Sequence, residues 1–526
     1  MASQLPDGTG VSQIGWSASL RTLADQYDQF VAVSDALGHT LTYSDLSRQA
    51  HSIAHFLLDS LGVQPGLPVA TLLPNSVTAV WVSYGVRMTG AAEVPVGWSS
   101  TVEEIAWCAQ LSGFRTVLTL SEREAELRQA GLDPICVDSL ATATNDTQLA
   151  AVDDSKPGRI LFTSGTTGKP KGVLYSHARR WGGEQLLKAT LPFVPHPGER
   201  IILMTPFVHG SSLLTYAWCD HGAHVVLLDG VREQDLVREL ADPSVRAIFA
   251  PPTVLAKITT LFEGQQFRHI KCVFTGTQPL TQLVYKRARE MFGPVVRITY
   301  GKSECVNPIT VLTPEQTEAY YGAETMPPGA CVGYPSPGVE IRIESAPPEP
   351  GQEQEERDGE IWLRARQMSH GMITEQGFKA HEPDGWHQTG DLGHLDSQGR
   401  LVLTGRVADV IKTGGYRVNP DEIEALLTGW SSGMQISVTS LPSDYWGEII
   451  VAVAEMPQSD WQEVIAERVQ GLSRHKRPRL CVTLDSLPRN PQGKVNRRQV
   501  RAQVLAHYVL EDGPYPVLMV RGATLP

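Results

Sequence analysis

Cysteine is scarce in this 526-residue sequence, and the cysteines that occur follow no metal-binding pattern. They number seven, an odd count, and no two are separated by only two residues. Neither a disulfide framework nor a zinc site is therefore indicated. Apolar runs of about 18 residues, which a membrane helix needs, are also missing. The first residues, MASQLPDGTG, lack the basic-then-apolar pattern of a secretory signal, so we expect a reducing, cytoplasmic enzyme without a membrane span.

An excess of positive charge is absent as well. The chain has 45 Lys and Arg residues against 57 Asp and Glu residues, a formal net charge of −12. A general nucleic-acid binder needs a basic face, so we expect no nucleic-acid partner. Small anionic ligands remain possible, because a local cluster of donors can bind an anion whatever the net charge.

Apolar runs and amphipathic stretches alternate along the chain, with Gly and Pro between them. The length allows several domains at about 150 residues each. Such alternation is typical of parallel βαβ units and predicts an α/β fold. Helices are expected within 41–58 and 76–88 and after the capping-box sequence that starts at Thr101. Strands are expected at 69–73, 94–96, 116–119, 201–204, 225–228, 247–249, 272–274, 361–363 and 401–403.

The stretch from Ile160 to Val173, ILFTSGTTGKPKGV, has the composition of a polyphosphate-binding loop. A short apolar strand leads into a turn of hydroxyls, glycines and one lysine. Glycines let backbone N–H groups approach an anion closely, hydroxyls add hydrogen bonds, and Lys169 adds positive charge. The spacing differs from a Walker A loop, because only two residues separate Gly165 from Gly168.

Several blocks further along the chain offer chemistry that suits a nucleotide. Tyr300 in TYGKSE presents an aromatic face for adenine, and Glu304 can hold Mg²⁺. Asp391 in GWHQTGDL can accept two ribose hydroxyls bidentately. Lys494 in PRNPQGKVNR follows a glycine that allows a tight turn, which would present the lysine's positive charge.

These blocks, in this order, closely resemble the signature motifs of the acyl-adenylate-forming (AMP-binding) superfamily, in its acyl-CoA synthetase branch. The resemblance runs from Thr163 to Lys494 and also includes TPFVHG, TGTQPL and GRVADVIKTGGYRV. This chain departs from the family pattern at several positions. They are Gly210, which comes early after His209, and Thr277, Gln278, Lys302, Ser303, His387 and Ala408.

The resemblance implies a large N-terminal domain of βαβ-type sheets, residues 1–404, and a small mobile C-terminal α+β lid, residues 405–526, with a hinge near Ala408. It implies an acyl-CoA ligase that uses ATP and Mg²⁺ to convert a carboxylic acid into acyl-AMP. Coenzyme A then takes the acyl group in a second step, after the lid has rotated.

The resemblance also assigns residues to the site. The catalytic group is Lys494, Lys412, His209 and Glu304, with Glu304 as the metal ligand. The acyl pocket includes His209, Gly210, Ser211, Thr275 and Lys302. Nucleotide and coenzyme A would contact Thr163, Ser164, Gly165, Thr166, Thr167, Gly168, Lys169, Gly276, Thr277, Gln278, Thr299, Tyr300, Gly301, Ser303, Asp391, Arg406, Gly414 and Gly415.

Alternative functions stay open at this point. The thiol acceptor could belong to an acyl carrier protein, or the enzyme could perform only the thioester half-reaction from a supplied acyl-AMP. A different class, an inactive scaffold that binds nucleotide or acyl-CoA, is disfavoured by Glu304, Asp391, Arg406 and Lys494. The sequence leaves the acid and the oligomeric state open, a dimer included.

Overall fold

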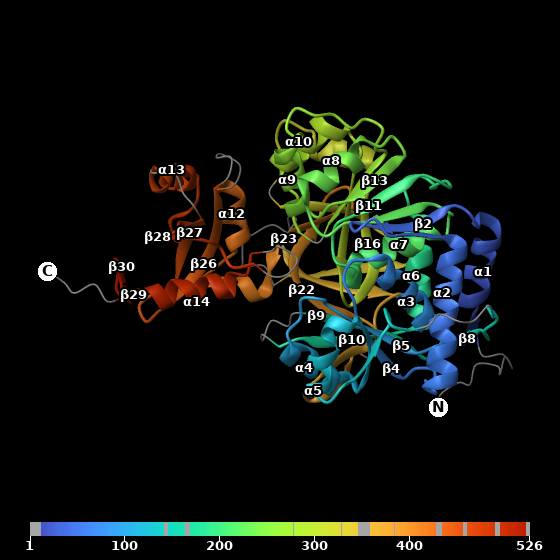
Figure 1. Cartoon of the computed structure of the whole chain (residues 1–526). Coiled ribbons are helices and arrows are strands. Elements are labelled where there is room, and N and C mark those ends of the chain that lie inside the picture. The colour runs from blue at the N-terminus through green and yellow to red at the C-terminus, as the bar shows by residue number, and fades with distance from the viewer. Residues whose placement is uncertain are drawn as a thin grey trace.

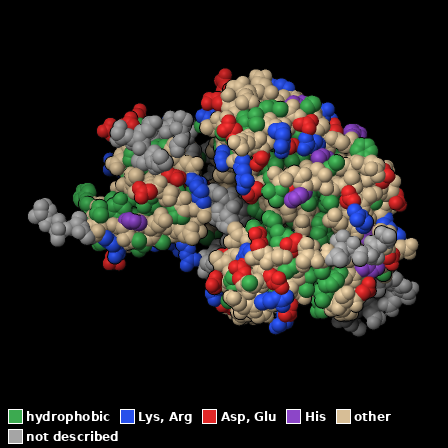
Figure 2. All heavy atoms as spheres, viewed as in Figure 1, with side chains coloured by type: hydrophobic (Ala, Val, Ile, Leu, Met, Phe, Trp, Pro, Cys, Tyr) green, Lys and Arg blue, Asp and Glu red, His purple; other side chains and the backbone are tan. Residues whose placement is uncertain are grey.

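The computed structural model describes residues 12–140, 146–163, 169–276, 278–327, 329–345, 358–382, 384–427, 434–455, 460–489 and 495–521. Figure 1 shows a larger body that contains the N-terminal end and a smaller body that contains α12–α14 and β26–β30. The same view in spheres shows a hollow between the two bodies (Figure 2). Among the residues described, none of the helices is both long enough and apolar enough to cross a membrane.

One sheet of the larger body runs in the order β21-β20-β10-β9-β5-β4-β6-β7 among the described residues. The strands from β9 to β7 pair in parallel, whereas β10, β20 and β21 are added antiparallel. Their bounds are β4 Pro68–Leu72, β5 Ala92–Val96, β6 Thr116–Thr119, β7 Asp133–Cys136, β9 Pro157–Thr163, β10 Lys171–Ser176, β20 Gly371–Thr374 and β21 Gly377–Ala380.

The second sheet is longer and runs in the order β18-β19-β22-β23-β17-β16-β15-β14-β13-β11-β12-β2-β3 among the described residues. It is parallel from β2 to β15 and antiparallel from β15 to β18. The strands of its parallel half, with β3, are β2 Val31–Asp35, β3 Thr40–Thr42, β11 Arg200–Leu203, β12 His224–Leu227, β13 Val245–Phe249, β14 Cys272–Gly276 and β15 Val296–Lys302. Those of its antiparallel half are β16 Cys305–Leu312, β17 Ala330–Pro335, β18 Val339–Glu344, β19 Gly359–Ala365, β22 His387–Leu395 and β23 Leu401–Arg406.

Helices cover both sheets and bury their apolar faces. One core cluster joins α1, α2, α3 and α7 to strands of both sheets, and a second packs α8–α11 on the longer sheet. The helix at Thr101 begins with the predicted capping box, in which Thr101 and Glu104 exchange hydrogen bonds. The bounds are α1 Trp16–Tyr27, α2 Tyr43–His55, α3 Val77–Met88, α4 Val102–Ser112, α5 Glu124–Gln129, α6 His177–Ala189, α7 Ser212–Cys219, α8 Glu233–Ala241, α9 Pro252–Leu261, α10 Gln282–Phe292 and α11 Pro314–Tyr321. Short pieces are β1 Gln13–Ile14, which pairs with β8 Val152–Asp153, and the π-helix η1 Phe56–Ser60.

The smaller body has its own sheet, in the order β25-β24-β27-β26 with β28 beside β27. Two apolar clusters, one on each side of β26 and β27, form its core. A hairpin of β29 and β30 follows α14 and contains the apolar stretch 517–520. The bounds are β24 Ile411–Thr413, β25 Tyr416–Val418, α12 Pro420–Leu427, β26 Gln435–Ser443, β27 Gly447–Glu455, α13 Trp461–Arg468, β28 Leu480–Leu484, α14 Arg497–His507, β29 Tyr508–Glu511 and β30 Val517–Val520.

The predicted α/β class is confirmed, and each of the strands and helices expected from sequence overlaps an element of the structure. The antiparallel half of the longer sheet was only partly foreseen, because strands were predicted at 361–363 and 401–403, which belong to β19 and β23, but not for the rest of this half. The polar stretch 346–358, predicted to be a solvated loop, lies almost wholly outside the described residues.

Candidate active site

The C-terminal ends of β14 and β15 form the first part of the candidate site. The strands pair in parallel, with Gly276 opposite Thr299. A Cβ atom at Gly276 would collide with the carbonyl oxygen of Thr299, so this close backbone contact requires glycine. The neighbouring Thr275 hydroxyl is buried and has no hydrogen-bond partner among the described residues. Gln278 is partly buried, and Thr277 lies outside the described residues.

A tight turn between β15 and β16 carries Ser303 and Glu304. Gly301 leaves no room for a side chain there, because a Cβ atom would collide with the amide group of Asn307. The Ser303 carbonyl accepts a 2.5 Å hydrogen bond from the hydroxyl of Tyr175 on β10. This bond joins the turn to the strand that follows the glycine-rich loop, so two motifs distant in sequence are held together.

Glu304 has the chemistry and the setting of a Mg²⁺ ligand. Its carboxylate is partly buried and takes part in no ion pair with the described residues. Within the described part of the chain, no group of three or more His, Cys, Asp or Glu side chains could hold a metal by itself. Mg²⁺ is usually bound by one or two carboxylates together with substrate phosphates and water. The residues present therefore fit a metal that arrives with a nucleotide.

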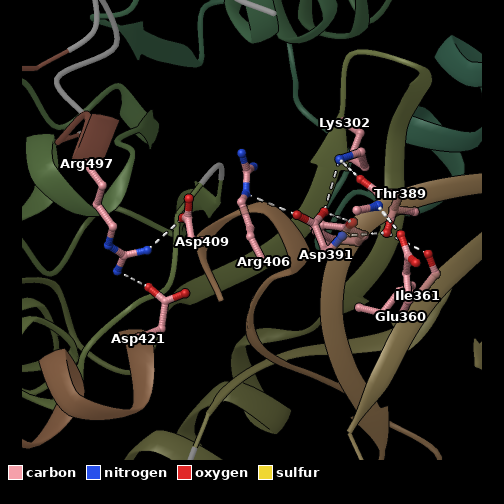
Figure 3. Close-up of polar contacts among 11 residues, drawn as sticks. Lys302, Glu360, Ile361, Thr389, Asp391, Arg406, Asp409, Asp421 and Arg497 are labelled. Carbon is pink, nitrogen blue, oxygen red and sulfur yellow. Dashed lines mark hydrogen bonds and ion pairs between the residues drawn. The ribbon is translucent and has the colours of Figure 1, made fainter. Parts of the chain in front are cut away.

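Asp391 on β22 is the centre of a buried polar cluster (Figure 3). Its Oδ2 atom accepts a 2.5 Å hydrogen bond from the Tyr300 hydroxyl and a 3.1 Å bond from Lys302 Nζ. Its Oδ1 atom lies 3.2 Å from Nε of Arg406, which faces Asp391 across the β22–β23 pair. The backbone N–H of Asp391 donates to the Thr389 hydroxyl. Three predicted site residues, Tyr300, Lys302 and Arg406, thus meet around the carboxylate of Asp391, a fourth.

The charges around Asp391 control its ionisation. Burial alone would raise the pKa of this carboxyl group, but the charges of Lys302 and Arg406 and the hydrogen bonds from Tyr300 and Lys302 outweigh it. The pKa of Asp391 is therefore lowered and the side chain is a carboxylate near neutral pH. Tyr300 itself lies within the apolar core, and burial, followed by the neighbouring carboxylate, raises its pKa well above the usual value.

A second polar cluster lies just beyond Arg406, where the chain leaves β23 and enters the short 3₁₀ helix η4, Val407–Asp409. Arg497, at the start of α14, donates to Asp409 at 2.8 Å and also binds Asp421 and Glu424 of α12. The predicted hinge residue Ala408 is exposed between these contacts. The turn after the larger body is thus attached to two helices of the smaller body.

The residues predicted to border the thiol route lie on β24 and on the exposed turn between β24 and β25. The Lys412 side chain is exposed, and its backbone N–H donates to Glu448 at 2.8 Å. Gly414 and Gly415 follow with φ of +56° and +84°, a conformation that favours glycine. The N–H of Gly414 donates to the Trp446 carbonyl at 2.8 Å, which fixes the turn against the next hairpin.

The glycine-rich loop is described only at its ends. Thr163 closes β9, while Ser164, Gly165, Thr166, Thr167 and Gly168 lie outside the described residues, as does Lys494. Lys169 extends over the Trp107 ring, with 4.0 Å from Nζ to the ring centroid, and pairs with Glu375 at 3.0 Å.

The predicted acyl-pocket segment forms a short π-helix, η3, over Phe207–Ser211. The side chain of His209 is not among those described. Gly210 lies against the ring of Phe249, where an added Cβ would be 3.3 Å from the nearest carbon. The Ser211 hydroxyl is fully buried and donates to the Thr205 carbonyl at 2.9 Å.

Some contributors to the site had not been assigned a role from the sequence. Thr389 supports both Asp391 and Lys302, Tyr175 holds the Ser303 turn, and Arg497 connects the hinge to α12. Arg497 is the last residue of the motif PRNPQGKVNR, and its place in this motif is the sequence signal that could have identified it. His387 is buried beside His381, and burial lowers its pKa to about 4, so its ring is neutral near pH 7.

Comparison with known proteins adds independent information. The AMP-binding enzyme family matches residues 20–372. A 4-chlorobenzoate–CoA ligase from an Arthrobacter species is 26% identical over 96% of this chain and 97% of its own length. A fatty acid–[acyl-carrier-protein] ligase from Streptomyces coeruleorubidus is 27% identical over 88% of this chain and 92% of its own.

A solved structure has the same fold. The o-succinylbenzoate CoA synthetase of Bacillus subtilis, in complex with its acyl-adenylate intermediate, matches with a TM-score of 0.79 and 25% identity over 93% of this chain and 98% of the other. The same synthetase has been solved with ATP and a magnesium ion, with a TM-score of 0.78. Because the family match spans well over half of the sequence, this chain belongs to the AMP-binding enzyme family.

Proposed function

We propose that this enzyme is an ATP-dependent, AMP-forming ligase that joins a carboxylic acid to the thiol of coenzyme A. The observation that carries the proposal is the Asp391 cluster, which gathers Tyr300, Lys302 and Arg406 beside the Glu304 turn. The relatives named as CoA ligases and the neighbour solved with an acyl-adenylate support the same reaction.

In the first step, a carboxylate oxygen of the acid attacks the α-phosphorus of ATP, and pyrophosphate leaves. Lys494 and the loop 163–169 neutralise charge at the phosphates, and Asp391 holds the ribose. Glu304 would hold Mg²⁺ together with the phosphates, and the ion would supply further charge neutralisation. The partly buried Glu304 turn, tied to β10 through Tyr175, is suited to hold such a group in a fixed place.

In the second step, the sulfur of coenzyme A attacks the acyl carbonyl and AMP leaves with the bonding electron pair, while the thiol loses its proton. We place the domain boundary between residues 404 and 405 and the hinge at Ala408. β23 of the longer sheet continues to Arg406 and the lid sheet begins at Ile411, so the connection between the two sheets contains Ala408, which supports the hinge at this residue. Rotation there would remove Lys494 and bring Lys412, Gly414 and Gly415 to the thiol route.

The test is acid-dependent release of pyrophosphate from ATP and Mg²⁺ across a panel of carboxylic acids, without and then with coenzyme A. We expect a signal with one class of acid and the matching acyl-CoA by mass spectrometry. Glu304→Gln should lower the rate roughly tenfold or more, because a neutral amide is a weaker ligand for Mg²⁺ than a carboxylate and the phosphates would lose part of their charge neutralisation. Glu324→Gln, at an exposed glutamate, serves as the matched control. Absence of pyrophosphate with every acid would contradict an adenylating enzyme.

A carrier-protein thiol is the second candidate acceptor, favoured by the similarity to a fatty acid–[acyl-carrier-protein] ligase. It is distinguished by repeating the assay with a phosphopantetheinylated carrier protein in place of coenzyme A. Thioester from supplied acyl-AMP, without pyrophosphate release, would instead indicate the half-reaction alone. We also propose a reducing, cytoplasmic location, which the seven free cysteines support.

A further inference from the structure

Lys302 lies next to the residues predicted to bind the nucleotide, and its side chain forms its hydrogen bonds within the larger body. Nζ donates to the Thr389 carbonyl at 2.9 Å and to Asp391 Oδ2 at 3.1 Å. The Lys302 side chain is 13% exposed and the Asp391 side chain 8% exposed. The ammonium group therefore points to Thr389 and Asp391 rather than into open solvent (Figure 3).

The two oxygens of Asp391 are not equally available to a ligand. A carboxylate offers about four acceptor positions, two on each oxygen. Both positions on Oδ2 are filled, by the Tyr300 hydroxyl and Lys302 Nζ. Among the described residues, Oδ1 has only Arg406, whose side chain is 48% exposed and belongs to the end of β23 next to the proposed hinge. A ribose hydroxyl can therefore reach Oδ1 but not Oδ2.

The hydrogen bonds of Lys302 to Thr389 and Asp391 should persist when a ligand binds. Thr389 is itself fixed, because its hydroxyl donates to the Ile361 carbonyl at 2.6 Å and accepts the N–H of Asp391. Moving Lys302 away would take the ammonium donor from the buried Thr389 carbonyl and leave Oδ2 of Asp391 with the Tyr300 hydroxyl alone, and the loss of a hydrogen bond to a buried polar group is costly. Ligand binding from the exposed side can displace Arg406 far more easily than Lys302.

We propose, building on the ribose role of Asp391 in the proposed function, that Lys302 is a positioning residue that closes Oδ2 and leaves Asp391 one oxygen for the ribose. One of the two ribose hydroxyls then binds Asp391 strongly, and the other finds water or a different group. Bidentate recognition of both hydroxyls, the arrangement expected from the sequence, requires a side chain at position 302 that does not bind Oδ2.

The experiment compares binding of AMP, 2′-deoxy-AMP and 3′-deoxy-AMP by calorimetry. In the natural enzyme, we expect removal of one hydroxyl to weaken binding roughly tenfold or more and removal of the other by less than about threefold. In Lys302→Met, Oδ2 becomes available, so both deoxynucleotides should bind roughly tenfold or more weakly than AMP. Lys302→Arg retains a charged donor and should keep the unequal pattern, as should the control Lys379→Met on exposed β21.

Each outcome decides the matter. Equal penalties for the two deoxynucleotides in the natural enzyme would overturn the proposal, and so would an unequal pattern that survives in Lys302→Met. Thermal melting of each variant identifies loss of folding, and Lys302→Arg still tests the pattern if Lys302→Met unfolds. Failure of the natural enzyme to bind AMP at all would overturn the nucleotide site itself, and with it the proposed function.

Discussion

The two charged clusters on either side of the hinge have opposite compositions (Figure 3). Around Asp391, one carboxylate faces two cations, Lys302 and Arg406. Around Arg497, one cation faces three carboxylates, Asp409, Asp421 and Glu424. The first cluster has a surplus of positive charge that suits an anionic ligand. The second has a surplus of negative charge that can be tolerated only with its arginine in place.

The difference separates a binding role from a structural one. The donors from β15 and β23 fill three of the roughly four acceptor positions of Asp391, so one position is left for a ligand. The pKa of Asp391 is lowered. Glu424 keeps 20% of its side chain exposed, and burial raises its pKa although Arg497 acts in the opposite direction. We therefore expect the Asp391 cluster to control nucleotide binding and the Arg497 cluster to control the stability of the lid.

Replacement of Arg497 should have the largest effect. Arg497→Ala leaves three neighbouring carboxylates without their common cation, and breaking a buried ion pair in this way costs about 3 kcal/mol or more. Denaturant unfolding, followed by fluorescence of the lid residues Trp446 and Trp461 after replacement of the other described tryptophans, would measure it. Arg128→Ala removes only the exposed pair with Glu124 and is the matched control. Equal stability of the two variants would contradict a structural role for the cluster.

Replacement of Asp391 should come next and should affect binding more than stability. Asp391→Asn keeps the shape but removes the charge, so the ribose contact loses a charge-assisted hydrogen bond and AMP should bind roughly ten- to a hundredfold more weakly. Calorimetric titration measures this change. Asp133→Asn, at an exposed pair with Arg115, should leave affinity unchanged. Full affinity in Asp391→Asn would remove Asp391 from the nucleotide site.

Acid should partly restore Arg497→Ala. Without the arginine, the pKa of Glu424 rises further above its unfolded value, so the folded lid binds more protons than the unfolded chain. Stability of the variant should therefore increase as the pH falls from 8 toward 5, and its deficit relative to the natural enzyme should shrink by about 1 kcal/mol. Unfolding curves at both pH values measure the deficit. A deficit that is constant or grows toward pH 5 would show that the carboxylates do not cause it.

The hinge substitution should have the smallest effect. Ala408 is exposed, so Ala408→Asp should change stability by less than about 0.5 kcal/mol. We expect a few-fold change in the ratio of thioester formation to adenylation, because Ala408 is the proposed hinge of the lid. Separate single-turnover measurements of the two half-reactions determine this ratio, and identical kinetics in variant and natural enzyme would exclude position 408 from the domain movement.

Local patterns predicted much of the fold and the composition of the site. The capping box at Thr101 and the apolar strand at 272–274 depend on neighbours in sequence, and both are confirmed. The long-range partners could not be predicted in this way. Lys302 binds a residue 89 positions away and Arg497 one 88 positions away, and no periodicity encodes such pairs. The sequence therefore identified Asp391 but not which of its two oxygens has an acceptor position left for a ligand.

The most direct test of the central claim follows oxygen atoms through the reaction. The enzyme is given ATP, coenzyme A and a substrate acid with both carboxyl oxygens replaced by ¹⁸O, and the AMP and acyl-CoA are weighed by mass spectrometry. Attack of the carboxylate on the α-phosphorus predicts one ¹⁸O in AMP and one in the acyl-CoA. Label in ADP or inorganic phosphate, or acyl-CoA formed without label in AMP, would contradict an acyl-adenylate intermediate.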